Sequence, residues 1–323
     1  MDALSDVISA VRLSGGVFLD AEFTAPWSIV SQLSAEEMRA LGAHPAQVIA
    51  YHYVVAGKLF VQIDDGAAVE VGPGEIVLLP RNDAHILSSQ PGLRPVVADD
   101  LAPMLADMSP VVLRYGGGGE TTHIVCGFLG CDVPRNPLLT TLPPLLKLEM
   151  QTEGDWIPRS FNHAAEEFAR GGIGSAAVLG KLAELLFVEA IRKYLATLPA
   201  GQTGWLAGLQ DRMVGRALAL LHARVAEPWT TEALAREVGL SRSAFADRFT
   251  SLVGMPPMHY LANWRLQLAA LRLRDSADPT MCIADNVGYA SDAAFIRAFK
   301  RNFGCTPAAW RRGQGVASLP ARQ

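Results

Sequence analysis

The stretch that decides the fold is residues 234–254, LAREVGLSRSAFADRFTSLVG, which recurs as residues 283–304, IADNVGYASDAAFIRAFKRNFG. Each copy begins with an aliphatic residue and Ala, followed three residues later by Val-Gly. Two phenylalanines four residues apart come next, and a glycine closes the copy. The two copies begin 49 residues apart, and everything between and around them has the apolar spacing of helices. The repeat therefore predicts one local helical structure that is built twice.

Each copy has the signals of two short helices joined by a tight turn. In the first copy, Thr231 and Ser241 are expected to cap the two helices, and Gly239 permits the left-handed residue of the turn. In the second copy, Gly288 makes the turn and Ser291 is the expected cap. These signals predict two helix-turn-helix units, and the second helix of such a unit enters the major groove of DNA.

The polar side chains on each second helix are of the kinds that bind DNA. Arginine offers two parallel donors to guanine or phosphate, and serine bonds to either. The predicted DNA-binding residues are Ser241, Arg242, Ser243 and Arg248 in the first copy and Ser291, Asp292, Arg297, Lys300 and Arg301 in the second. Aspartates near the second copy favour backbone contacts over dense base readout there. The alternative interpretation is a helical bundle whose arginines are only solvated.

Charge is divided unevenly along the chain, although the net charge of the 323 residues is only −4. Residues 1–210 carry 13 basic and 23 acidic side chains, whereas residues 211–312 carry 14 basic and 9 acidic ones. The acidic part and the basic part are expected to handle different partners. The predicted domains are 1–198, a linker at 199–204, 205–312, and a flexible tail at 313–323.

Residues 205–312 resemble the AraC/XylS family of bacterial transcription regulators. The resemblance is carried by the two copies above and by Tyr260-Leu261, Trp264-Arg265 and Pro307-x-x-Trp310-Arg311. It implies two helix-turn-helix units joined by a long helix, here about residues 257–273. It also implies double-stranded DNA as the partner, read in two successive major grooves about 34 Å apart.

The first third of the chain is rich in short β-strand signals. The expected strands are residues 47–55, 59–63, 68–71, 76–79 and 123–129, separated by Gly, Pro and Asp turns. This region resembles the cupin barrels found at the N-terminus of such regulators. The predicted fold class is therefore α+β, with a cupin-like β-barrel and following helices in front and an all-α domain behind.

The resemblance to metal-binding cupins is incomplete. Of four ligand positions, His52 and His85 are kept, whereas Val54 and Lys58 replace a histidine and a glutamate. Cys126 on a later strand could complete a zinc set with the two histidines. The alternative is that both histidines are core residues or line a pocket for an organic ligand, with Cys126 in the core.

Cys126 and Cys131 form a second candidate, a redox pair, although a spacing of five places them on opposite faces of a regular strand. Four cysteines without a Cys-x-x-Cys pair fit a reducing cytoplasm. No stretch is apolar enough to span a membrane, because residues 176–198 carry five charges. That stretch has an apolar stripe (Val178, Leu182, Leu185, Leu186, Val188 and Ile191), which we interpret as a homodimer interface or as core.

These features together predict a cytoplasmic, sequence-specific transcription regulator. It is expected to be an activator that works with RNA polymerase and answers a small-molecule, metal or redox signal through its front domain. It is not expected to be an enzyme. The competing hypothesis is a metal-dependent cupin enzyme with a helical appendage, which the loss of two metal-ligand positions opposes.

Overall fold

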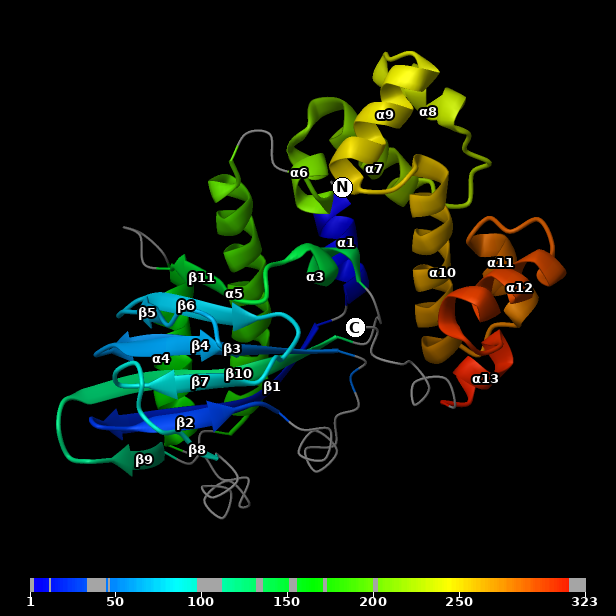
Figure 1. Ribbon diagram of the computed structural model, residues 1–323. Helices are drawn as coiled ribbons and strands as arrows, with labels where there is room; N and C mark the ends of the chain where they lie inside the picture. The colour runs from blue at the N-terminus through cyan, green and yellow to red at the C-terminus, as the bar shows by residue number, and fades with distance from the viewer. Residues whose placement is uncertain are drawn as a thin grey trace. The chain divides into compact units, whose positions relative to one another are not determined.

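The computed structural model describes residues 3–11, 13–33, 45, 47–97, 112–131, 136–150, 156–170, 173–199 and 203–313. The chain forms two compact units (Figure 1). One is sheet-rich and contains residues 13–131 and 142–196. The other is helical and contains residues 197–323 together with two short pieces from earlier in the chain, 1–12 and 132–141. The predicted tail from residue 314 onward, and residues 200–202 of the predicted linker, lie outside the described residues.

The sheet-rich unit contains two sheets. The first has the strand order β11-β6-β3-β10-β1-β9. The bounds are β1 Leu13–Thr24, β3 Gln47–Ala56, β6 Glu75–Leu79, β9 Val112–Gly116, β10 Thr121–Cys131 and β11 Leu146–Glu149. The second has the order β5-β4-β7-β2-β8. Its bounds are β2 Ser28–Ser31, β4 Leu59–Ile63, β5 Val69–Val71, β7 His85–Ser88 and β8 Val96–Val97.

The two sheets enclose one apolar core, to which both contribute. Phe23 and Val54 come from the first sheet, and Val61 and Leu87 come from the second. Because neighbours on a strand face opposite sides, Ala50, His52 and Val54 point into this interior. Tyr51 and Tyr53 are buried on the other face of the same sheet.

The expected barrel is not closed. Among the described strands, the two sheets end at β11 and β9 and at β5 and β8, and these end strands do not pair with each other. The unit is therefore a sandwich of two open sheets. A strand's sequence pattern reports which face is buried but not which strand pairs at its edge, so the prediction of a closed barrel was wrong.

Helices α4 (Trp156–Ala169) and α5 (Ser175–Thr197) follow the strands and lie behind them in Figure 1. α4 packs on β1, and the Lys193 ammonium on α5 donates to the carbonyls of Glu149 and Met150 at 3.3 and 3.2 Å. The apolar stripe on α5 divides: Leu186 and Ile191 are buried, whereas Val178 and Leu185 are exposed. Leu182 and Val188 are half-buried, so the stripe is divided between the core of this unit and its surface. No described helix is both long enough and apolar enough to cross a membrane.

The helical unit is built around α10, residues Pro257–Asp275. Its other helices are α1 Ala3–Val11, α3 Pro137–Thr141, α6 Trp205–Gln210, α7 Arg212–Ala223, α8 Thr231–Val238, α9 Arg242–Val253, α11 Thr280–Asn286, α12 Asp292–Phe303 and α13 Pro307–Arg311. α1 packs against α7, and α3 packs against α6. Both of these pieces were predicted to belong to the front domain.

The two halves of α10 serve different neighbours. Its first half carries Tyr260, whose hydroxyl is 2.8 Å from the Trp205 indole nitrogen and 2.7 Å from His222 Nε2. Trp264 stacks on His222 with ring centroids 4.2 Å apart. Its second half packs Leu266, Ala269, Ala270 and Leu273 into a core with α11, α12 and α13. The long helix therefore packs on α6 and α7 with its first half and on α11, α12 and α13 with its second half.

Candidate nucleic-acid interface and sensor site

The first helix pair consists of α8 and α9. The cap of α8 is Thr230, not the expected Thr231, and its hydroxyl accepts from the Ala233 N–H at 3.1 Å. α8 ends at Gly239, whose φ of 74° is the left-handed conformation that glycine adopts without strain. Ser241 caps α9 as predicted, accepting from the Ala244 N–H at 3.2 Å. Phe245 is fully buried and anchors α9 to the core.

The second pair, α11 and α12, repeats this plan with a longer turn. Gly288 in that turn has a φ of 86°. Ser291 caps α12 as predicted, accepting from the Ala294 N–H at 3.4 Å. Phe295 and Phe299 are fully buried, as their counterparts are in the first pair.

The predicted DNA-binding side chains are mostly exposed on these second helices. Ser241, Arg242, Ser243 and Arg248 are exposed in the first pair, and Ser291, Arg297, Lys300 and Arg301 are exposed in the second. Asp292 is half-buried in the first turn of α12, where a carboxylate favours the positive end of the helix dipole. Two of the predicted serines, Ser241 and Ser291, already serve as helix caps.

Arg248 differs from the expectation of a freely projecting side chain. Its Nε lies 3.1 and 3.0 Å from the two carboxylate oxygens of Asp211, and its Nη2 lies 2.5 Å from one of them. Asp211 also caps α7, accepting from the N–H groups of Met213 and Val214. The hydrogen bond from Arg248 lowers the pKa of Asp211. Arg248 therefore ties α9 to α7, a role that the sequence analysis missed.

The sheet-rich unit brings His52, His85 and Cys126 together, as the metal hypothesis expected. His52 Nδ1 lies 2.9 Å from the Cys126 sulfur, and His52 Nε2 lies 2.7 Å from His85 Nε2. His85 Nδ1 in turn lies 2.8 Å from the Asp83 carbonyl oxygen. The three side chains form a connected cluster across the sandwich interior, from Cys126 on β10 through His52 on β3 to His85 on β7.

Burial keeps the cluster of His52, His85 and Cys126 uncharged. Burial, followed by the nearby His85, holds the pKa of His52 well below its ordinary value. Burial also lowers the pKa of His85 and raises the pKa of the Cys126 thiol. Near neutral pH the cluster is therefore two neutral imidazoles and a protonated thiol, and a thiol of this kind reacts poorly as a nucleophile.

The arrangement does not fit a zinc ion held by all three groups. Metal ligands converge on one point, and a histidine supplies one nitrogen to a metal while the other nitrogen bonds elsewhere. Here His52 points one nitrogen at Cys126 and the other at His85. Within the described ranges, no group of three or more His, Cys, Asp or Glu side chains is arranged to hold a metal ion. His123 faces elsewhere and pairs with Asp20, whose hydrogen bond raises the pKa of His123.

Cys126 and Cys131 do not lie together. Both are on β10, which pairs continuously with β3 from Ile124 to Cys131. At about 3.3 Å per residue, five residues of strand span about 16 Å, and a disulfide needs Cα atoms within about 7 Å. The predicted redox pair is therefore incompatible with this strand, and neither Cys126 nor Cys131 forms a disulfide among the described residues.

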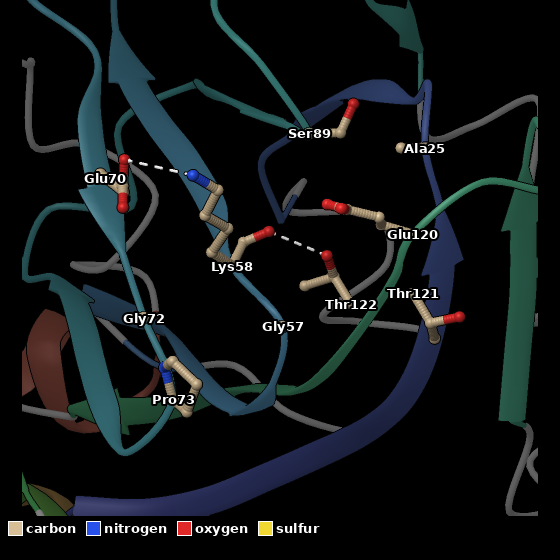
Figure 2. A pocket seen from close by; sticks show the side chains of 10 residues that line it. All are labelled: Ala25, Gly57, Lys58, Glu70, Gly72, Pro73, Ser89, Glu120, Thr121 and Thr122. Carbon is tan, nitrogen blue, oxygen red and sulfur yellow. Dashed lines mark hydrogen bonds and ion pairs between the residues drawn. The ribbon is translucent and has the colours of Figure 1, made fainter.

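A hollow lies where turns of both sheets meet (Figure 2), and its volume is about 350 Å³. An adjoining hollow of about 460 Å³ shares Ala25, Lys58, Ser89 and Glu120 with it. The Lys58 ammonium lies 3.7 Å from the Glu70 carboxylate, and Figure 2 shows Glu120 and Ser89 on the other side. His52 and His85 do not line either hollow.

Known proteins match the chain over nearly its whole length. Residues 2–196 match the family described as Cupin, and residues 234–313 match the family described as Helix-turn-helix domain. A Streptomyces lividans protein described as an AraC-like transcription regulator is 31% identical over 314 residues, which cover 97% of this chain and 98% of that protein. The RCS-specific HTH-type transcriptional activator RclR of Escherichia coli (strain K12) is 27% identical, covering 96% of this chain and 97% of that protein.

Among solved structures, the DNA-binding domain of AdpA in complex with a target DNA is 29% identical and covers 33% of this chain and 96% of that chain, with a TM-score of 0.31. The sequence matches and the helix pairs define a DNA-binding transcription regulator and not an enzyme, as predicted. The chain belongs to the AraC family of helix-turn-helix regulators and carries a cupin-type N-terminal domain.

Proposed function

We propose that this regulator reads a specific DNA sequence through two helix-turn-helix units. In this proposal α9 and α12 enter successive major grooves, about 34 Å apart on one face of the duplex. The observation that carries the proposal is the repeated helix pair, in which the second helix begins at a serine cap in both copies, mounted on the single helix α10. Arg242 on α9 and Arg297 on α12 are the side chains best placed to bond base edges, because each is exposed and has no bonded partner among the described residues.

Selection of bound sequences from a random double-stranded DNA pool by the purified full chain tests this proposal. We expect one enriched motif with two conserved blocks about one helical turn apart. Recovery of a single block would contradict two-unit reading. Recovery of no motif at physiological salt would indicate nonspecific binding.

The sheet-rich unit is proposed to sense the signal that controls DNA binding. We favour the hollow at Lys58 and Glu120 as the signal-binding site over the cluster of His52, His85 and Cys126. The hollow is open to solvent, and its lining combines side chains of both charge signs with hydroxyl groups. These features suit a small polar organic molecule. Thermal unfolding of the full chain in the presence of a metabolite library tests this. Glu120→Gln is expected to abolish any stabilisation, and Glu232→Gln, at an exposed position on α8, is the control.

A resident metal is not part of the proposal, since His52, His85 and Cys126 do not converge. Elemental analysis of the purified full chain should find less than about one zinc per ten chains. Stoichiometric zinc that is lost in His85→Ala would contradict this interpretation.

We also propose that the regulator is a homodimer, acts in the cytoplasm and activates RNA polymerase. The dimer is supported by Val178 and Leu185 on α5, which are exposed and seven residues apart on one helix face. Light scattering of the full chain should show a dimer that Leu185→Glu converts to a monomer. Transcription in vitro with RNA polymerase on the selected DNA would decide between activation and repression.

A further inference from the structure

Arg265 lies in the middle of α10 and bonds to three main-chain carbonyls. Its Nε donates to Val225 O at 2.9 Å and its Nη2 to Glu227 O at 2.6 Å. Its Nη1 donates to Gly288 O at 3.0 Å. The first two carbonyls belong to the segment between α7 and α8, and the third belongs to the turn between α11 and α12. One guanidinium therefore bonds both to the segment that leads into the first helix pair and to the turn inside the second helix pair.

The contact requires an arginine at position 265 and a glycine at position 288. A side chain at Gly288 would place its Cβ 2.7 Å from Arg265 Nη2 and 2.8 Å from the Ala226 carbonyl oxygen, which is closer than such atoms approach. The φ of 86° at Gly288 also disfavours other residues. A planar fork of donors reaches three carbonyls in different directions, which a lysine ammonium on a flexible stem cannot reproduce.

Two of the three bonds of Arg265, to Val225 O and Gly288 O, are partly buried, whereas the bond to Glu227 O is exposed. The residue is half-buried, and this burial lowers the pKa of its guanidinium. A partly desolvated charge is destabilising unless its donors are satisfied, and here they are satisfied by three carbonyls. The three bonds are therefore expected to behave as one unit, because breaking one leaves the charge poorly solvated.

One end of this contact lies close to α12, which is proposed to read DNA, and the other end lies close to α8, the partner of the proposed reading helix α9. Gly288 is three residues before Ser291, the cap of α12, and Glu227 is three residues before Thr230, the cap of α8. A shift at either end moves the helix pair that follows it. The remaining packing of α10 attaches each helix pair separately, the first through the contact of Tyr260 with Phe249 on α9 and the second through the core around Leu273.

We propose that Arg265 is a positioning residue that fixes the spacing and orientation of the two helix pairs relative to each other. It would then set the distance between the two DNA blocks that the protein recognises, without touching a base. This inference rests on the proposed two-unit reading of DNA.

The test measures binding of the full chain to DNA duplexes that carry both selected blocks at their natural spacing, at spacings altered by one or two base pairs, or one block alone. The wild type should prefer the natural spacing by about tenfold or more. Arg265→Lys keeps the charge but loses the fork. Its affinity for the duplex with the natural spacing should fall about tenfold, whereas its affinity for the single block should equal that of the wild type. Its affinity should therefore depend less on the spacing between the blocks.

Arg272→Lys is the matched control, because Arg272 is an exposed arginine on the same helix. It should retain the spacing preference. Gly288→Ala, which pushes on the guanidinium from the other side, should reproduce the flattened preference and provides a second variant if Arg265→Lys unfolds by circular dichroism. An unchanged spacing preference in either folded variant would overturn the inference, as would equal loss on the single block. Failure of the wild type to bind two-block DNA would instead overturn the proposed function.

Discussion

The two helix pairs of the helical unit share one plan but are attached in different ways. In the first pair, a tight turn at Gly239 has open space around it. In the second pair, the turn at Gly288 is held by Arg265. The basic side chains also differ, because Arg248 of α9 is bonded to Asp211, whereas Lys300 and Arg301 of α12 remain exposed.

A repeated sequence therefore does not give both copies the same side-chain contacts. The first pair uses a basic side chain to secure α9 to α7 and leaves Arg242 and Ser243 exposed. The second pair offers a denser basic surface on α12, which suits phosphate contacts. We therefore expect the first pair to contribute more base readout and the second pair more phosphate binding.

The largest expected effect tests whether the cores of the two helix pairs are equivalent. Phe249 and Phe299 are equivalent in the repeat and both fully buried. Phe249→Ala and Phe299→Ala should each cost about 3–5 kcal/mol of stability. Urea unfolding followed by circular dichroism measures both losses. A loss below about 1 kcal/mol in one variant only would show that the two cores are not equivalent.

The second effect distinguishes the two halves of the helical unit by the pH dependence of their stability. Burial lowers the pKa of His222 to about 3, against an ordinary value of about 6.5. The neutral imidazole is the stable folded form, so its contribution is complete above pH 6.5 and is lost as the pH falls toward 3. The second helix pair and its half of α10, residues 266–313, contain no histidine.

Amide hydrogen exchange at pH 7 and pH 4.5 should therefore show the first helix pair losing protection before the second. The variant His222→Phe keeps an aromatic ring against Trp264 and should reduce this acid sensitivity. Equal loss of protection in both pairs would contradict the assignment to His222.

The third effect concerns sequence reading. Arg242→Ala and Arg297→Ala should each weaken binding to the selected DNA by about 1–3 kcal/mol if each side chain bonds a base. Relaxed specificity should appear at one position of the corresponding block. Quantitative binding to duplexes substituted one base pair at a time measures this. If neither variant changes affinity or footprint, α9 and α12 have been wrongly assigned to the grooves.

The smallest effect distinguishes the two kinds of basic residue. Arg301→Ala should reduce the salt dependence of DNA binding by about one unit of slope, as expected for one lost phosphate contact. Arg248→Ala should leave that slope nearly unchanged, because Asp211 already binds the guanidinium. Fluorescence anisotropy over a range of salt concentrations compares the variants. A larger change of slope in Arg248→Ala than in Arg301→Ala would reverse the comparison.

Much of the helical unit could be predicted because its information is local. Ser241, Ser291 and Gly239 act where their chemistry indicated, and α10 extends only two residues beyond the predicted end. The bonds of Arg265 and Arg248 could not be predicted, because they join residues far apart in sequence. A charged side chain with a distant partner leaves no periodic signal.

The sheet-rich unit was less predictable for a related reason. The resemblance to metal-binding cupins singled out His52 and His85, but it could not show which imidazole nitrogen would meet which partner. β1 was missed because Gly15 and Gly16 interrupt its apolar pattern. Whether a barrel closes depends on edge pairing between distant strands, which local patterns do not encode.

The placement of α1 and α3 with the helical unit means that the chain passes between the two units four times. A protease that cuts once, near residues 199–204, would leave both fragments holding parts of the helical unit. The nicked protein should therefore stay together on gel filtration and separate only on denaturation. Fragments that begin at residue 205 would also lack α1 and α3, exposing the surfaces of α7 and α6 that these helices cover. A soluble DNA-binding fragment is better obtained by fusing α1 back onto it than by trimming at the linker.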